Sequence, residues 1–152
     1  MFLCAQVHNR IRELERFVRL FTVIEAQMSY TLQPTESLLK NLCSFSEFQN
    51  FSFVHLLYNK FHSGEPLQDA WKTALTAYAK HSALQKSDLE RIGAFGGVFG
   101  ATDITGQKEN CIYFAEQLTQ LCGELKKSEK STSKLYLSLG MLGGLFIIIL
   151  LL

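Results

Sequence analysis

The chain has 152 residues, with 15 Lys and Arg against 14 Asp and Glu and a formal charge of +1 at pH 7. This balance excludes the strongly basic character typical of nucleic-acid-binding domains, so we expect no nucleic-acid partner. Only two prolines interrupt the long apolar-periodic stretches, which favours a mostly helical protein. The four cysteines form no C-x-x-C pair, and we interpret them as small buried residues of a reducing compartment rather than as disulfides or metal ligands.

The first helix is predicted from about Leu3 to Thr31, because apolar residues recur there at intervals of three and four. Its arginines at positions 12, 16 and 19 share one face. We interpret that face as solvated, and an acidic partner or a lipid head group as the alternative that would use Arg12, Arg16 and Arg19. After a proline, a short second helix is expected over about Thr35 to Cys43.

A third helix, rich in aromatic residues, is predicted over about Glu47 to His62, with Ser46 as its N-cap. Gly64 is placed to end it, and a fourth helix is expected from Pro66 to about Lys80. The fourth helix contains the single tryptophan, Trp71. We interpret Trp71 as a core anchor rather than as a hot spot for binding.

The fifth helix is expected to open with a capping box, in which the side chains of Ser87 and Glu90 satisfy each other's backbone N–H groups. Four glycines follow at i, i+3, i+4 and i+7, which would place them on one helical face: Gly93, Gly96, Gly97 and Gly100. Glycine costs about 1 kcal/mol relative to alanine inside a helix, so such a stripe predicts close packing of another helix. A phosphate-binding loop is the alternative, but neither G-x-G-x-x-G nor G-x-x-x-x-G-K-[ST] occurs.

The last soluble helix is predicted to begin near Thr105, with Asp103 as its cap. Asp103 and Gln107 share this helix start, and we interpret them as structural or interaction residues in preference to acid–base catalysts. No helix breaker lies between Glu124 and Lys134, so the helix is expected to continue directly into the C-terminal segment.

That segment, Leu135 to Leu152, carries no charge. As a helix it would be about 27 Å long, close to the hydrocarbon core of a bilayer at about 30 Å. We predict a transmembrane anchor over 135–152 and a helical bundle domain over 1–134; a buried core helix is the alternative. Four lysines precede the anchor, so the positive-inside rule places the domain in the cytoplasm: Lys126, Lys127, Lys130 and Lys134.

The anchor contains a G-x-x-x-G pattern, Gly140 and Gly144, with Gly143 as a further small residue. Such a pattern permits a second membrane helix to cross closely, and self-association of the chain is one way to supply that helix. Ordinary tolerance of glycine in membrane helices explains the pattern equally well.

No constellation of residues requires an enzyme, a cofactor or a metal. The four histidines are not spaced with a carboxylate or thiol as metal ligands are, and the common nucleophile and zinc-protease motifs are absent. We expect a non-enzymatic protein without cofactor or metal, and a site assembled from distant residues is the alternative.

Several stretches of the chain resemble one family, stage III sporulation protein AB of endospore-forming bacteria. They are Ile24-Glu25, Tyr30, Pro34 and Leu38; Gly64, Ala70-Trp71 and Leu75; Asp88, Phe95-Gly96, Gly100, Asp103 and Gln107; and, most specifically, Leu135-Tyr136, Leu139-Gly140 and Leu142-Gly143-Gly144-Leu145. The resemblance implies an antiparallel bundle of about six helices, like the cytoplasmic domains of type II secretion F proteins. It also implies a role in the secretion-like channel between mother cell and forespore during engulfment, on the mother-cell side of the outer forespore membrane.

The resemblance implies partners as well: a stage III sporulation protein AA-like ATPase, other channel subunits and the membrane. Family members usually begin with their own transmembrane helix, and this chain starts about where that helix should end. The resemblance leaves two alternatives: the start site is called too late and an N-terminal span is missing here, with Met1 to Ala5 as its remnant, or this member is truncated. The expected function is assembly of the channel. The alternative is an unrelated tail-anchored regulator or small-ligand sensor, with a pocket between the third and fourth helices.

Overall fold

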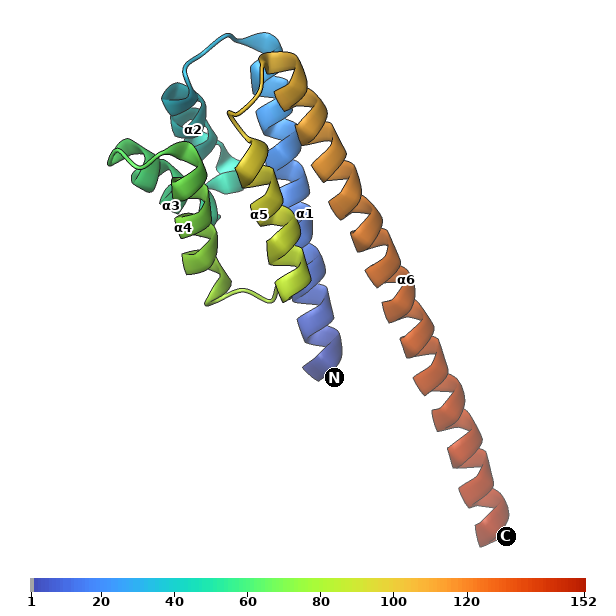
Figure 1. Ribbon diagram of the computed structural model, residues 1–152. Coiled ribbons are helices and arrows are strands. Elements are labelled where there is room, and N and C mark those ends of the chain that lie inside the picture. Colours follow the sequence, from blue (N-terminus) through green and yellow to red (C-terminus); the bar gives the residue numbers. More distant parts are fainter. Residues whose placement is uncertain (1) are drawn as a thin grey trace.

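The computed structural model describes residues 2–152, and this part of the chain contains helices and no strand. The helices are α1 (Phe2–Tyr30), α2 (Thr35–Ser44), the 3-10 turn η1 (Ser46–Phe48), α3 (Ser52–His62), α4 (Leu67–Ala79), α5 (Lys86–Val98) and α6 (Ile104–Leu151). α1 and α6 are antiparallel, so that the N-terminus and the C-terminus point to the same end of the molecule (Figure 1). The predicted all-α bundle with a long C-terminal helix is confirmed.

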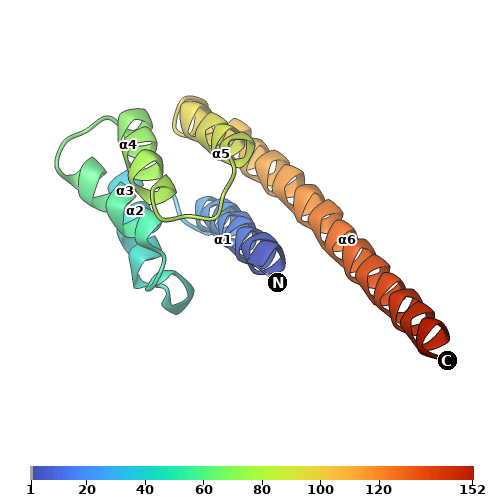
Figure 2. The ribbon, with the colours of Figure 1, turned by 90° about the horizontal axis from the view of Figure 1, so that it is seen from below.

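α1 is the central helix of the bundle. Seen along its axis, α2, α3 and α4 lie on one side of it and α6 on the other, with α5 between α4 and α6 (Figure 2). α1 buries a continuous stripe against these neighbours: Ile11, Leu14, Phe17, Leu20, Phe21, Val23 and Ile24. The spacing of three and four along this stripe is the periodicity that the sequence displays.

The third helix differs from its prediction. Residues 46–48 form the separate turn η1, Phe51 is extended with φ −98° and ψ 91°, and α3 begins only at Ser52. Ser46 makes no capping hydrogen bond, so its predicted N-cap role is wrong. Phe51 and Phe53 are both fully buried. In a continuous helix, residues two positions apart point to nearly opposite sides. Both rings can enter the core because the helix is interrupted before Ser52.

The start of α5 also differs. The helix begins at Lys86, and its capping box is formed by Gln85 and Asp88 rather than by Ser87 and Glu90. The backbone N–H of Gln85 donates to the Asp88 carboxylate over 2.9 Å. Ser87 and Glu90 are exposed, whereas Asp88 is fully buried. The helix is therefore capped by Asp88. Because this carboxylate is buried, it requires hydrogen-bond donors inside the protein, and the Gln85 backbone N–H is one of them.

Trp71 of α4 lies at the centre of an aromatic core. Its side chain is 1% exposed, and its indole N–H donates to the carbonyl oxygen of Ile92 over 3.1 Å. Phenylalanine rings from three other helices surround it, with ring centroids at 4.9 Å for Phe53, 5.0 Å for Phe95 and 6.3 Å for Phe21. This arrangement places the single tryptophan where α1, α3, α4 and α5 meet.

The four glycines of the predicted stripe have four different environments. A Cβ at Gly96 would lie 2.1 Å from Cδ1 of Trp71, and one at Gly93 would lie 3.6 Å from Cδ2 of Leu75. A Cβ at Gly97 would meet no atom within 4 Å. Gly100 lies beyond the end of α5 with φ +80°. The expected single helical face therefore does not exist: α4 packs closely on Gly96, while Gly97 faces open space.

We expect the Gly96→Ala substitution to destabilise the bundle by about 2–3 kcal/mol, because the new methyl group must displace a fully buried indole. The measurement is denaturant unfolding of the full chain in detergent, followed by the fluorescence of Trp71. The matched control, Gly97→Ala, should leave stability unchanged or raise it by up to about 1 kcal/mol. Equal effects of the two substitutions would contradict this account of the α4–α5 contact.

Candidate functional site

α6 joins the bundle and the apolar segment in one helix of 48 residues. Its first half buries Cys111, Leu118 and Cys122 in the core, whereas every residue from 131 onward is exposed. Among the described residues it is the one helix long and apolar enough to cross a membrane, and none of its most apolar 18-residue stretch is buried. The alternative of a buried core helix is therefore wrong for this segment.

The first turn of α6 is held by local hydrogen bonds. Oδ1 of Asp103 accepts from the backbone N–H of Gly106 over 2.9 Å, which is the capping contact expected from the sequence. The Gln107 side-chain amide donates to the carbonyl oxygen of Thr102 over 2.7 Å. The side chains of Asp103 and Gln107 thus both bond to the backbone of this turn, an arrangement that shapes the loop before α6.

An apolar groove of about 930 Å³ separates the start of α1 from the lower part of α6. Leu3, Cys4 and Val7 line one side of it, and residues of α6 that include Tyr136 and Gly140 line the other. The first turn of α1 therefore lies beside the beginning of the uncharged segment. The glycines at 140, 143 and 144 all have room for a further helix, since a Cβ added to Gly140, Gly143 or Gly144 would meet no atom within 4 Å.

A second apolar groove, of about 670 Å³, runs between α4 and α5. Leu75, Leu89 and the backbone of Gly93 and Gly97 contribute to its lining, and charged residues that include Lys72 and Glu90 border it. Because a methyl group added at Gly97 would meet no atom within 4 Å, the α5 backbone is accessible there. Such a groove suits the apolar face of a partner helix.

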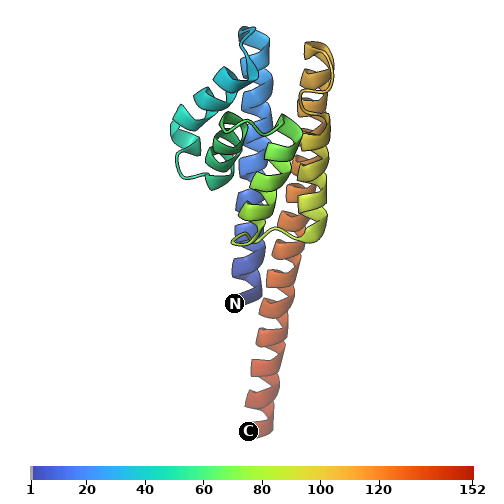
Figure 3. The same ribbon diagram turned by 60° about the vertical axis from the view of Figure 1, so that its left-hand side comes forward.

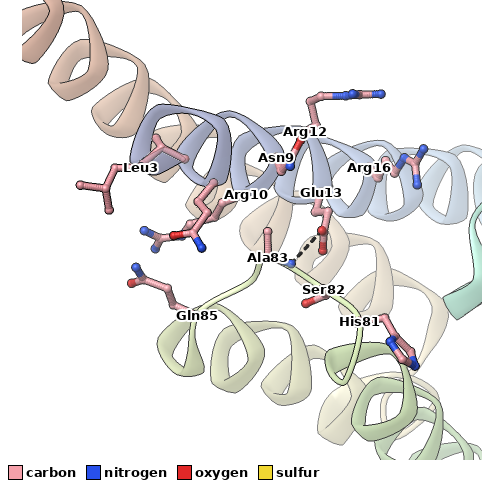
Figure 4. Close-up of a pocket in the computed structure, with 12 residues that line it drawn as sticks. Leu3, Asn9, Arg10, Arg12, Glu13, Arg16, His81, Ser82, Ala83 and Gln85 are labelled. Atoms are coloured by element: carbon pink, nitrogen blue, oxygen red, sulfur yellow. Dashed lines mark hydrogen bonds between the residues drawn. The ribbon is translucent and has the colours of Figure 1, made fainter. Parts of the chain in front are cut away.

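A polar pocket of about 730 Å³ lies between the first half of α1 and the α4–α5 connection (Figure 4). Arg16 extends outward from α1, Arg12 extends from the side of α1 that faces away from the connection, and His81 lies on the connection. Glu13 points toward the connection, where its carboxylate accepts from the Ala83 backbone N–H at 2.9 Å and from the Tyr78 hydroxyl at 3.1 Å. Burial, together with the Glu13 carboxylate, raises the pKa of Tyr78, so this hydroxyl remains a hydrogen-bond donor.

Beside this pocket, Arg10 and Asp88 form a buried ion pair that sequence analysis missed. Nε and Nη2 of Arg10 donate to the two Asp88 oxygens over 2.7 and 2.8 Å. These hydrogen bonds raise the pKa of Arg10 although burial lowers it. One signal in the sequence pointed to the pair: Arg10 lies three residues after Val7 and four before Leu14, and so shares their helical face, where its guanidinium needs a partner.

The described residues contain no group of three or more His, Cys, Asp or Glu side chains that could hold a metal ion. The cysteines of the bundle are free thiols, and burial raises the pKa of Cys111 to about 12. A thiol in that environment stays protonated at neutral pH and makes a poor nucleophile.

The family model of stage III sporulation protein AB matches residues 1–152. The chain belongs to the stage III sporulation protein AB family. A solved structure of a stage III sporulation protein AB is similar to it with a TM-score of 0.62 and 18% sequence identity, over 81% of this chain and 98% of that chain. At this identity the likeness shows the fold, whereas the family match shows a role in sporulation. A comparison with curated proteins finds no match.

We expect Arg10→Met to destabilise the bundle by about 3–5 kcal/mol, because it leaves the buried Asp88 carboxylate without its cation. Asp88→Asn should also destabilise the bundle, because it leaves the Arg10 guanidinium without its anionic partner. The double variant should be less destabilised than the sum of the two single variants, since no unpaired charge remains inside. Denaturant unfolding of the four proteins in detergent measures this coupling, and strictly additive effects would show that the pair has no structural role.

Proposed function

We propose that the chain is a non-enzymatic, membrane-anchored assembly component of the secretion-like channel between mother cell and forespore. Membership of the stage III sporulation protein AB family supports this proposal. The structural observation that carries it is the continuity of α6, which passes from the core of the bundle into the exposed apolar segment as one helix. Such a helix holds the bundle at a fixed distance above a membrane.

The proposed location is the outer forespore membrane, with the bundle over 1–134 on the mother-cell side and the anchor over 135–152. The four lysines that precede the anchor support this orientation, because basic flanks favour the cytoplasmic side. The open face at Gly140, Gly143 and Gly144 offers a contact for another membrane helix, from a channel subunit or from a second copy of the chain.

The proposed soluble partner is a secretion-type ATPase that resembles stage III sporulation protein AA, together with other channel subunits. The groove between α4 and α5 is the surface that we assign to a partner helix, because it is apolar and the α5 backbone is accessible at Gly97. Its charged border of both signs, Asp69, Lys72, Lys86 and Glu90, would orient the partner.

The alternative function, a regulator or small-ligand sensor, required a pocket between the third and fourth helices. Aromatic side chains fill this interface: the ring of Phe53 lies 4.9 Å from that of Trp71 and 6.2 Å from that of Tyr78. A packed interface of this kind favours the assembly function over the sensor function.

We expect Gly97→Leu to weaken binding of the purified full chain to the ATPase about tenfold or more, which corresponds to about 1.4 kcal/mol, because the new side chain occupies the groove. Affinity is measured by biolayer interferometry with the chain in nanodiscs. The matched control is Gly123→Leu on α6, where an added Cβ likewise meets no atom within 4 Å.

Two outcomes would contradict the proposal at different points. Unchanged affinity of Gly97→Leu would remove the α4–α5 groove as the docking surface. Failure of the unaltered chain to bind the ATPase or any other channel subunit would remove the assembly function itself.

A further inference from the structure

One end of the bundle is positively charged. We define the base as residues 2–16, 80–91 and 124–134, which comprise the start of α1, the α4–α5 connection with the start of α5, and α6 just before the anchor. The base contains ten Lys and Arg against six Asp and Glu, a formal charge of +4. The rest of the chain contains the remaining five Lys and Arg against eight Asp and Glu, a formal charge of −3. The net charge of +1 therefore conceals a strong polarity along the bundle.

The base lies next to the membrane if α6 spans it. Lys126 is paired with Glu15 of α1, so these two residues lie at about the same level along the bundle. At about 1.5 Å of rise per residue, Lys126 is about 13 Å above Leu135, and Arg12 is about 4 Å closer to the membrane than Glu15. Arg12 therefore lies about 9 Å from the start of the anchor, close to the layer of lipid head groups.

The polar pocket is the concave corner of this base. α1 projects beyond the α4–α5 connection toward the end where the anchor lies (Figure 3). The pocket follows this projection from Leu3 up to Arg16 and is closed on the other side by His81, Ser82, Ala83 and Gln85. Its lower end thus opens toward the membrane, while its upper end is bounded by arginine and histidine side chains.

Arg10 of this corner is paired with Asp88, whereas no carboxylate of the described chain neutralises its other two arginines. Among residues 2–152, neither Arg12 nor Arg16 forms a salt bridge, although the guanidinium of Arg16 lies 5.8 Å from the ring centroid of Phe51. The one acidic side chain in the pocket lining, Glu13, already accepts two hydrogen bonds from Tyr78 and Ala83. Arg19, farther from the membrane on the same face, is paired with Glu47.

We propose that the base binds the head groups of anionic phospholipids in the membrane that α6 crosses, with the polar pocket as the site of one phosphate. Arg16 in the pocket and Arg12 at its rim supply planar guanidinium groups suited to phosphate oxygens, and His81 and Ser82 of the connection supply further polar groups. The anionic surface attracts basic groups within a Debye length of about 8–10 Å, which includes the level of Arg12. The proposal rests on α6 as a membrane span but not on the docking of any protein partner.

Head-group binding gives the bundle a second attachment. α6 alone leaves the bundle free to tilt with its anchor, whereas a contact at the α1 and α4–α5 side of the base lies off the α6 axis (Figure 2). Two attachments fix the direction in which the α4–α5 groove faces. Binding of anionic head groups would therefore determine how the α4–α5 groove is presented to the other channel subunits.

The test is hydrogen–deuterium exchange of the full chain in nanodiscs, followed in peptides that cover residues 80–86. Phosphatidylglycerol in the nanodisc should slow exchange about fivefold or more relative to phosphatidylcholine alone, and about 0.5 M NaCl should remove the difference. Arg12→Gln/Arg16→Gln should lose most of the protection. The control Lys40→Gln/Lys60→Gln removes two cations that lie outside the base and should retain it.

Each other outcome overturns the proposal in a recognisable way. Equal exchange in both lipids, with the chain inserted, removes head-group binding and leaves the anchor and the partner-docking proposal standing. Protection by soluble glycerol 3-phosphate in phosphatidylcholine nanodiscs, equal to that by phosphatidylglycerol, would identify a site for free phosphate esters instead. Failure of the chain to insert would remove the span and, with it, this inference.

Discussion

The close approach of Trp71 to Gly96 is the contact on which the arrangement of the bundle depends. No other residue type at position 96 leaves room for the indole, because even a Cβ would lie 2.1 Å from its ring. The indole N–H reaches the carbonyl oxygen of Ile92 one turn earlier on α5, so the ring is fixed in direction as well as in depth. Fixing α4 on α5 in this way also fixes the connection between them, which carries one wall of the polar pocket.

The buried pair of Arg10 and Asp88 then sets the height of this connection on α1. Asp88 belongs to the first turn of α5 and accepts hydrogen bonds from both the Arg10 side chain and the Gln85 backbone. A shift of α5 along α1 would leave the buried Asp88 carboxylate without its cation, so the pair disfavours other registers of α5 against α1. On the other side of α1, α6 packs through its buried residues Cys111, Leu118 and Cys122, and the exposed pair of Glu15 and Lys126 lies at the same contact.

The sequence predicted what depends on local periodicity and local chemistry. The stripe of α1, the cap at Asp103, the continuity of α6 and its exposed uncharged end all follow from residues close to one another along the chain. The break before α3 did not follow, because nothing local shows that Phe51 and Phe53 must both be buried. The capping box of α5 was assigned to the wrong residues for a related reason. Asp88 is selected by Arg10, which lies 78 residues away in the sequence.

The same distinction applies to the candidate site. Four glycines at helical spacing suggested one packing face, but the structure distributes them between a close contact at Gly96, an open groove at Gly97 and a loop at Gly100. Folding separates these glycines but brings basic residues together, although the composition alone suggested a nearly neutral protein. Folding gathers ten basic residues at the base and leaves an excess of acidic residues elsewhere. A nucleic acid requires a large basic surface, whereas a flat anionic membrane would contact only the end of the bundle that faces it. The balance of charge that argues against the first partner is therefore compatible with the second.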